Sequence, residues 1–357
     1  MALIMFTGFD LSNDADQFPF FTANTSLTLS STTRYTYGYS LQVGSSAPAM
    51  IRLDAAYSEL IIEFDCFLST FETTGAPAGA FFEIQTEDGV GQICLCFESE
   101  SGGSANVQFK TDAGGTLGSA TTGYPIPINA WFHIGIRVKI SSTVGEVELM
   151  VDTGAGPVQE ILDTGLDTEH IVGKIMQNFN VRRPNFSGSY FMDNLIVMDE
   201  TGAKDNDFKG PSRVFYGLPA TDGDLTDFTP LSSTNVSQVD ERPPDEDSTY
   251  NQSPTSGHRD CFNFPTWTGV LDGALPIVGI RVYSFARKTD ATPVSLKNFG
   301  RRSSVNYDGS NAVSLGDSFT AIADMDSPIE FWTEDPFDAA DWTVAKLNAF
   351  QWGYTIP

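Results

Sequence analysis

The sequence predicts an all-β protein made of two domains. Residues that favour strands and turns are abundant, with 27 Phe and 32 Gly in 357 residues, and long runs of strong helix formers are absent. Hydrophobic residues make up 41% of the chain, which is enough to build packed cores. The length exceeds that of one ordinary β-sandwich and fits two domains.

The boundary between the domains is predicted at a strand over residues 189–202. Its β-branched, aromatic and methionine residues are typical of a buried strand, and Asp199 and Glu200 end it. Directly afterwards the composition changes, because residues 204–268 are rich in Pro and Asp and lack a clear periodicity. We therefore expect a sandwich over 1–203 and a second β-rich domain over 204–357, which begins with the extended segment 204–268.

In the first domain, alternation and turn signals predict a series of antiparallel strands. The clearest is 131–140, in which Phe132 and Ile134 alternate with His133 and Gly135. With 146–152 it predicts an amphipathic hairpin that turns one face to water. The other expected strands are 1–6, 39–43, 50–53, 60–68, 80–86, 91–98, 106–111, 171–179 and one from 190.

Shorter strands and one helix are expected in the second domain. Asp338 is predicted to cap a short helix that runs to about Asn348. The last strand, 349–356, has one apolar face, so we expect it to be docked in a sheet. The other strands are expected at 213–218, 276–287, 294–299, 312–315 and 319–323.

The formal net charge of −26 narrows the range of partners. Such a surface repels nucleic acid and anionic membranes through its long-range field. No apolar run reaches the length of a membrane span, and the first residues lack the basic start and cleavage site of a secretory signal. We therefore expect no nucleic-acid partner and no membrane insertion.

The four cysteines are predicted to be free thiols from a reducing site of synthesis. They are Cys66, Cys94, Cys96 and Cys261, and they show no regular disulfide spacing. Cys94 and Cys96 are two apart on one predicted strand, so they share a face but are poorly placed to bond each other.

Several segments carry resemblances to known families. Residues 129–139, 145–152 and 191–197 resemble laminin-G-like (concanavalin-A-like) sandwiches. The chain as a whole also resembles structural proteins of tailed-bacteriophage virions, through residues 3–10, the stretch Asp-Glu-x-Pro-Pro-Asp-x-Asp-x-x-Tyr at 240–250, and residues 342–353. The resemblance implies a concanavalin-A-like jelly roll built into a capsid or tail. It supplies no agreed catalytic residues, so none are carried over.

The pair Glu63 and Asp65 is the first candidate for chemistry. Alternation places both carboxylates on one face of a strand, as a glycosidase requires. Concanavalin-like glycosidases carry Glu-x-Asp-x-x-Glu, and here the third acidic position is Leu68. We therefore predict no catalytic residues, and we interpret the pair as part of a solvated strand face.

Calcium is the second candidate, because clustered carboxylates in loops offer the hard oxygen ligands that it prefers. Neither cluster has EF-hand spacing, so the favoured interpretation is that they cap backbone N–H groups in turns. We predict no bound metal or cofactor, with Ca²⁺ as the alternative. The candidate ligands are Asp222, Asp224, Asp227, Asp245 and Asp247.

No other residue type forms a recognised site. His133, His170 and His258 lack zinc spacing, and His133 is expected on a strand surface. The doublets Arg182-Arg183 and Arg301-Arg302 are expected to pair with carboxylates, in this chain or on a neighbouring subunit. Three tryptophans are able to stack on sugars, but core or interface packing is favoured. These are Trp267, Trp332 and Trp342.

The leading hypothesis is a non-enzymatic virion component, either a capsid decoration or a tail- or fibre-associated protein. It would be made in the bacterial host cytoplasm and would assemble through β-sandwich domains with copies of itself and other virion proteins. One alternative is a carbohydrate-binding appendage that recognises host-surface glycans. A second alternative is a glycoside hydrolase of concanavalin-like fold.

Overall fold

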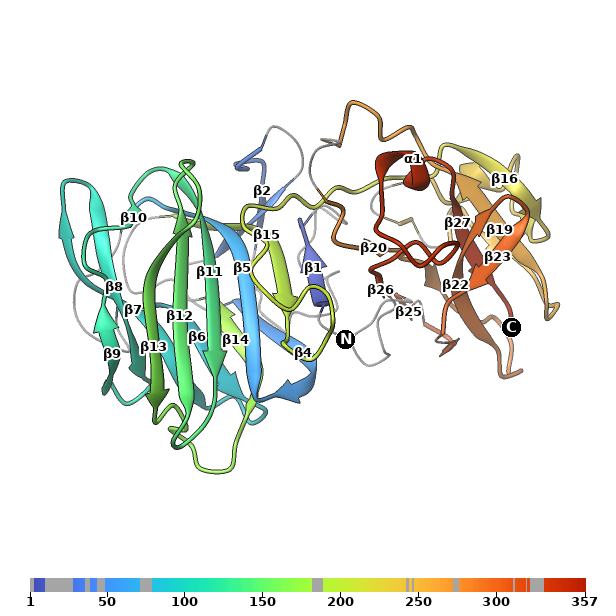
Figure 1. Cartoon of the computed structure of the whole chain (residues 1–357). Helices are drawn as coiled ribbons and strands as arrows, with labels where there is room; N and C mark the ends of the chain where they lie inside the picture. Colours follow the sequence, from blue (N-terminus) through green and yellow to red (C-terminus); the bar gives the residue numbers. More distant parts are fainter. Residues whose placement is uncertain are drawn as a thin grey trace. The chain divides into compact units, whose positions relative to one another are not determined.

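The computed structural model describes residues 3–9, 28–35, 39–43, 49–70, 79–181, 189–241, 244–245, 247–271, 276–310, 312–318, 320–321 and 331–357. The chain divides into two compact units, Met1–Phe215 and Tyr216–Pro357 (Figure 1). Within the described residues the units consist of antiparallel strands and a single-turn helix, so the predicted all-β class is confirmed. No helix in these ranges is long and apolar enough to cross a membrane.

The first unit contains two large antiparallel sheets. The eight-stranded sheet has the order β13-β12-β11-β5-β15-β3-β2, and β1 also pairs with β15. Its strands are β1 (Leu3–Thr7), β2 (Thr28–Ser30), β3 (Ser40–Val43), β5 (Glu59–Leu68), β11 (Trp131–Lys139), β12 (Gly145–Asp152), β13 (Val158–Leu166) and β15 (Tyr190–Met198).

The seven-stranded sheet has the order β10-β8-β7-β6-β14-β4, and β9 also pairs with β8. Its strands are β4 (Ala49–Tyr57), β6 (Ala80–Thr86), β7 (Gly91–Ser101), β8 (Ser104–Thr111), β9 (Thr116–Ala120), β10 (Ile126–Pro127) and β14 (Met176–Val181). The strand expected over 171–179 therefore begins later, because residues 172–173 form a turn.

The core of the first unit lies between these two sheets. Phe64 of β5 stacks on Phe82 of β6, and Phe82 stacks on Phe179 of β14, with 5.7 Å between ring centroids in each pair. All three rings are buried, and each contributes roughly 1.5–3 kcal/mol through burial. The alternation read from the sequence thus assigns the inner face of β5 correctly.

The outer face of β5 differs from the prediction. The register pairs Glu63 with Gly135 and Asp65 with His133 on the neighbouring strand β11. The side chains of Glu63, Asp65 and His133 are 1%, 0% and 2% exposed. The expectation of a solvated face is therefore wrong here, because later residues of the same unit cover it.

A bulge interrupts the adjacent strand β15. Its register with β5 shifts between Asp193 and Ile196. Asn194, within this shift, has φ of 49°, a left-handed conformation in which asparagine is one of the few tolerated residues. The bulge turns the Asn194 side chain toward Asp65, to which its amide donates a hydrogen bond.

The second unit is built on a six-stranded sheet of order β16-β19-β27-β22-β23, with β24 on β22. Its strands are β16 (Thr221–Thr226), β19 (Arg259–Asn263), β22 (Ser295–Arg302), β23 (Val305–Asp308), β24 (Val313–Ser314) and β27 (Gln351–Thr355). The small pairs are β17 (Thr229–Pro230) with β18 (Asn251–Gln252), β20 (Ile280–Arg281) with β26 (Phe331–Trp332), and β21 (Phe285–Ala286) with β25 (Thr320–Ala321).

The C-terminal strand β27 lies inside this sheet, between β19 and β22. Phe350 and Trp352 pack with other aromatic residues in one buried cluster, and Ile356 joins a second cluster against which Tyr354 packs. A docked terminal strand was expected, and this is confirmed. The close pairing of β27 with β19 requires Gly353, because a Cβ there would lie 1.9 Å from the carbonyl oxygen of Asp260.

Several local expectations in the second half of the chain are wrong. The region 276–287, expected as one strand, holds two short strands, β20 and β21, that are separated by irregular residues. Residues 213–218 form no strand. The helix is a single turn, α1 (Val344–Leu347), and Thr343 caps it by accepting a hydrogen bond from the Lys346 N–H at 3.2 Å. The carboxylate of Asp338 instead accepts the N–H of Ala340 in the preceding turn. A 3₁₀ turn at Val236–Gln238 lies within the segment that was expected to be extended.

Candidate functional site

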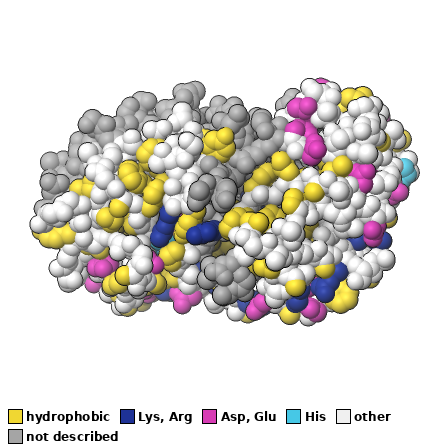
Figure 2. Space-filling model, turned by 90° about the horizontal axis from the view of Figure 1, so that it is seen from above, with side chains coloured by type: hydrophobic (Ala, Val, Ile, Leu, Met, Phe, Trp, Pro, Cys, Tyr) yellow, Lys and Arg dark blue, Asp and Glu magenta, His cyan; other side chains and the backbone are white. Residues whose placement is uncertain are grey.

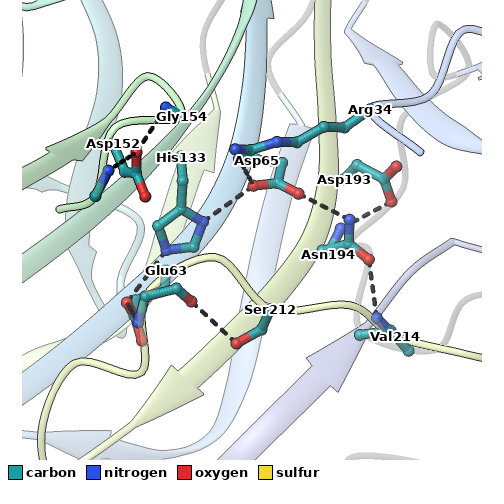
Figure 3. Close-up of polar contacts among 12 residues, drawn as sticks. Arg34, Glu63, Asp65, His133, Asp152, Gly154, Asp193, Asn194, Ser212 and Val214 are labelled. Carbon is teal, nitrogen blue, oxygen red and sulfur yellow. Dashed lines mark hydrogen bonds and ion pairs between the residues drawn. The ribbon is translucent and has the colours of Figure 1, made fainter. Parts of the chain in front are cut away.

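The candidate site is a buried polar cluster on the outer face of the eight-stranded sheet (Figure 3). His133 lies between two carboxylates, with Nε2 3.2 Å from Glu63 Oε1 and Nδ1 3.0 Å from Asp65 Oδ1. An ionised carboxylate only accepts hydrogen bonds, so each ring nitrogen must donate. This geometry therefore favours the doubly protonated imidazolium.

Two opposing effects act on the pKa of His133. Burial lowers it, since the charged ring is removed from water, while hydrogen bonds to Asp65 and Glu63 and the charges of these carboxylates raise it. The second effect is the larger, and the pKa lies above its usual 6.5. The sequence offered no sign of this, because the strand pattern placed His133 on a surface.

Asp65 has two further partners. The guanidinium of Arg34 forms an ion pair with its Oδ1, and the Asn194 amide donates to its Oδ2 at 2.9 Å. Two cations, Arg34 and His133, thus face the two carboxylates, and their charges offset the cost of removing the carboxylates from water. Both oxygens of Asp65 are engaged by donors of its own chain.

A later segment, residues 207–214, covers the cluster and is called the strap below. The N–H groups of Lys209 and Gly210 donate to Glu63 Oε2 and Oε1 at 2.7 and 2.9 Å. Gly210 has φ of 73°, and such a turn allows consecutive N–H groups to converge on one anion. Further along, the N–H of Val214 donates to Asn194 Oδ1 at 2.9 Å.

Side chains also fasten the strap to the sheet. The Phe208 ring fills the space above Gly135, where a Cβ would lie 2.7 Å from the ring. The Arg137 guanidinium lies 5.0 Å from the centroid of the same ring and forms an ion pair of 2.6 Å with Asp207. Only glycine at 135 leaves room for this contact.

The geometry decides what the carboxylate pair is able to do. Glu63 and Asp65 share a face, as expected, but donors of the same chain occupy both and neither is open to solvent. Leu68, at the position of the missing acid, is buried in the core. A glycosidase needs carboxylates that reach a substrate and a water molecule. In this arrangement Glu63 and Asp65 are covered and reach neither.

Two further aspartates near the cluster also serve local structure. Asp152, paired with His133 across the sheet, accepts the N–H groups of Gly154 and Gly156 at 2.6 and 3.0 Å. Asp193, paired with Asp65, accepts the N–H of Asn194 at 2.8 Å. Both support the turns and the bulge that shape the site.

An aromatic group lies beside the carboxylates on the same outer face. Phe67 is cross-strand partner to both Trp131 and Phe191. Its ring centroid is 5.7 Å from that of Trp131 and 5.8 Å from that of Phe191. Phe67 and Trp131 are half-buried and present partly open rings, which the sequence reading did not single out.

The structure gives each calcium candidate a hydrogen-bond or ion-pair partner. Asp222 accepts the N–H of Val236, Asp227 that of Arg259, and Asp245 that of Thr249. Asp247 forms an ion pair with Arg287. A hydrogen bond from Gln351, followed by the ion pair with Arg301, lowers the pKa of Asp224. Among the described residues, no group of three or more His, Cys, Asp or Glu is placed to hold a metal ion.

The other histidine and arginine candidates have ordinary environments. His258 Nδ1 lies 2.7 Å from Ser253 Oγ, and the side chain of His170 is partly exposed. The pairing expected for the second arginine doublet is confirmed, because Arg301 contacts Asp224 and Arg302 contacts Asp335. The doublet at 182–183 lies outside the described residues.

The three tryptophan candidates lie in or against a buried cluster, and the cysteines are buried as well. Trp332 and Trp342 belong to a buried cluster against which Trp267 packs, which confirms the core interpretation. All four cysteines are buried and unbridged. Cys94 and Cys96 share a face, as expected, with 3.1 Å between their Sγ atoms. Burial raises the pKa of the Cys66 thiol well above its usual value.

Comparisons with known proteins concern the fold. No protein-family description matches the chain. No curated protein matches its sequence. Among solved structures, a peanut lectin with a nonapeptide is similar over 56% of this chain and 98% of its own, at 9% identity and a TM-score of 0.36. The metal-free exoplasmic/lumenal domain of VIP36 is similar over 60% and 98%, at 9% identity and a TM-score of 0.35.

A third similar structure is the catalytic domain of a glycoside hydrolase family 131 protein from Coprinopsis cinerea. It covers 54% of this chain and 83% of its own, at 12% identity and a TM-score of 0.30. At these levels of similarity, neither sugar binding nor catalysis follows for this chain.

Proposed function

We propose that the chain is a non-enzymatic structural component of a tailed-phage virion, either a capsid decoration or a tail- or fibre-associated protein. The virion setting rests on the resemblance of residues 3–10, 240–250 and 342–353. The non-enzymatic role rests on one observation above all, which is the closure of the Glu63–His133–Asp65 cluster by the strap.

A closed ionic cluster suits a structural role. Removing several charges from water is costly, and a network of this kind contributes chiefly by specifying one arrangement of the elements it joins. Here it joins β5, β11, the bulge of β15 and the strap. Figure 2 shows acidic side chains spread over the visible surface, and a net charge of −26 keeps crowded copies soluble.

The proposal is tested on purified particles. The chain should sediment with infective particles through a density gradient, in a fixed copy number that quantitative mass spectrometry measures. An abundant acidic host protein of similar mass, followed in the same gradient, controls for trapping. Absence of the chain from infective particles, or a copy number no higher than that of the control, would refute the virion role.

The non-enzymatic part has its own test. A panel of soluble polysaccharides is incubated with the chain and with the Glu63→Gln variant, and released reducing ends are measured. We expect the same background from both. Hydrolysis by the original chain that the variant lacks would instead identify a working carboxylate.

Glycan binding is the second candidate function, and the aromatic group of Phe67, Trp131 and Phe191 favours it, because the first two rings are only half-buried. Aromatic faces stack on sugar rings, and this group lies on an outer sheet face. A glycan array with the chain and its Trp131→Ala variant tests it. Binding that the variant loses would support a role in recognising host-surface glycans, and no binding by either would remove it.

A further inference from the structure

We propose that the outer face of the eight-stranded sheet is a peptide-binding site, and that its ligand in assembly is the strap of a second copy of the chain. In the structure the strap of the same chain fills this site. The contacts that recognise the ligand are therefore visible, and they define its chemistry.

The first element of recognition is the peptide main chain. Glu63 accepts two consecutive N–H groups, from Lys209 and Gly210, and Asn194 accepts a third from Val214. Both acceptors are themselves fixed, Glu63 by His133 and Asn194 by its bond to Asp65. A carboxylate that accepts two N–H groups gives short, strong hydrogen bonds and selects an extended segment with a turn at glycine.

The second element is a set of side-chain anchors. Phe208 enters the slot above Gly135, and Asp207 reaches Arg137 at 2.6 Å. Near the other end, the Arg213 guanidinium lies 3.7 Å from the centroid of the Tyr35 ring. The site therefore takes a segment with an acidic and an aromatic residue, then two free N–H groups, then a cation.

The position of the strap makes a second copy the fitting partner. Residues 199–220 contain no helix or strand, and the strap ends next to the boundary between Phe215 and Tyr216. A segment in such a connection can occupy its own site or the identical site of a neighbour, because the contacts are the same in both cases. Every copy carries both the site and the ligand.

This inference deepens the proposed assembly function and rests on it for its biological setting. Its test uses purified chain alone. If the strap does not bind a second copy, the test of the virion role on purified particles is therefore unaffected. If the chain is absent from particles, the test of strap binding between copies is likewise unaffected.

The test is a complementation between two variants. Gly135→Leu fills the slot and blocks the site while keeping the strap intact, and Phe208→Ala weakens the strap while keeping the site intact. Neither variant alone has both an open site and an intact strap. The mixture has both, because the Phe208→Ala copy supplies the site and the Gly135→Leu copy supplies the strap. We expect native mass spectrometry and light scattering to show a heterodimer in the mixture alone, and excess synthetic peptide 204–214 to dissolve it.

Three results would overturn the proposal. The first is a mixture without heterodimer at chain concentrations up to ~1 mM, about the effective concentration of a short flexible tether. The second is a heterodimer that persists when Lys209→Pro removes one N–H from the intact strap, because the two copies would then meet elsewhere. Peptide binding without a heterodimer also counts against a second copy as the partner.

Circular dichroism checks that the variants are folded. If either is not, the pair Glu63→Ala and Lys209→Pro replaces it, since these remove the acceptor and one donor of the same contact. The same outcomes then decide the question.

Discussion

His133→Gln is the substitution with the most informative expected effect. The glutamine amide has one donating and one accepting end, so it is able to satisfy only one of the two carboxylates that His133 contacts. The positive charge is lost as well. Asp65 keeps Arg34 as a cation, whereas among the described residues Glu63 keeps the strap N–H groups but no cation.

The expected loss follows from these contacts. Removing one partner from a buried ionic network costs about 3–5 kcal/mol, because the remaining charge is left without compensation. We expect about 3 kcal/mol, the lower end, since Arg34 still balances Asp65 and the glutamine retains one hydrogen bond. His170→Gln is the matched control, with a change within about 0.5 kcal/mol, because the His170 ring is partly exposed.

The pH dependence has a definite sign. The pKa of His133 is raised in the folded chain above its usual 6.5. Its contribution is therefore fully present below pH 6.5 and is lost as the pH rises through the folded value. The free energy of unfolding of the original chain should therefore fall as the pH rises above 6.5 through the folded pKa. That of His133→Gln should depend less on pH there.

Native-state hydrogen exchange of the β11 and β12 amides measures the unfolding free energy of the first unit separately from the second. The reasoning is refuted if His133→Gln costs no more than His170→Gln. It is equally refuted if both proteins show the same pH profile above 6.5.

Three further predictions concern backbone fit and metals. Asn194→Gly should be more stable than Asn194→Ala by about 1 kcal/mol, although both lose the same hydrogen bonds, because only the backbone term differs at positive φ; equal thermal midpoints would count against a left-handed Asn194. Gly353→Ala should yield insoluble protein, since its Cβ would clash with the backbone of Asp260. Gly316→Ala is the control and should stay soluble, because its Cβ meets nothing within 4 Å. Soluble Gly353→Ala with an unchanged melting temperature would contradict the strand register. EDTA should leave the melting temperature unchanged, and a fall that Ca²⁺ reverses would identify the loops of Asp222 or Asp245 as a metal site.

Local patterns in the sequence were sufficient for the paired strands β5 and β11. The alternation of Ile62 and Phe64 with Glu63 and Asp65 reports which side chains share a face, since strand geometry fixes this within a few residues. The hydrophobic core and the common face of Cys94 and Cys96 follow from the same rule.

Burial of the polar face was not predictable from these strands. The residues that cover Glu63 and His133 lie in the strap, far along the chain. No periodicity signals this contact, because 207–214 has no regular secondary structure. The small residue Gly135 in a β-branched strand was the one available sign that something packs closely there.

Turn chemistry was the other source of error. Asp338 and Thr343 are both acceptable N-cap residues, and the sequence alone does not separate them. In the structure Asp335 accepts the N–H of Phe337 and Asp338 that of Ala340, so this stretch forms a turn and the helix begins only after Thr343.

Hydrogen exchange at the strap tests the central claim most directly, namely that the paired carboxylates bind the protein's own main chain. The amides of Lys209 and Gly210 should be strongly protected in the original chain and should exchange at nearly unprotected rates in Glu63→Ala. Rapid exchange of both amides in the original chain would contradict the account, because Glu63 would then be free to act on something else.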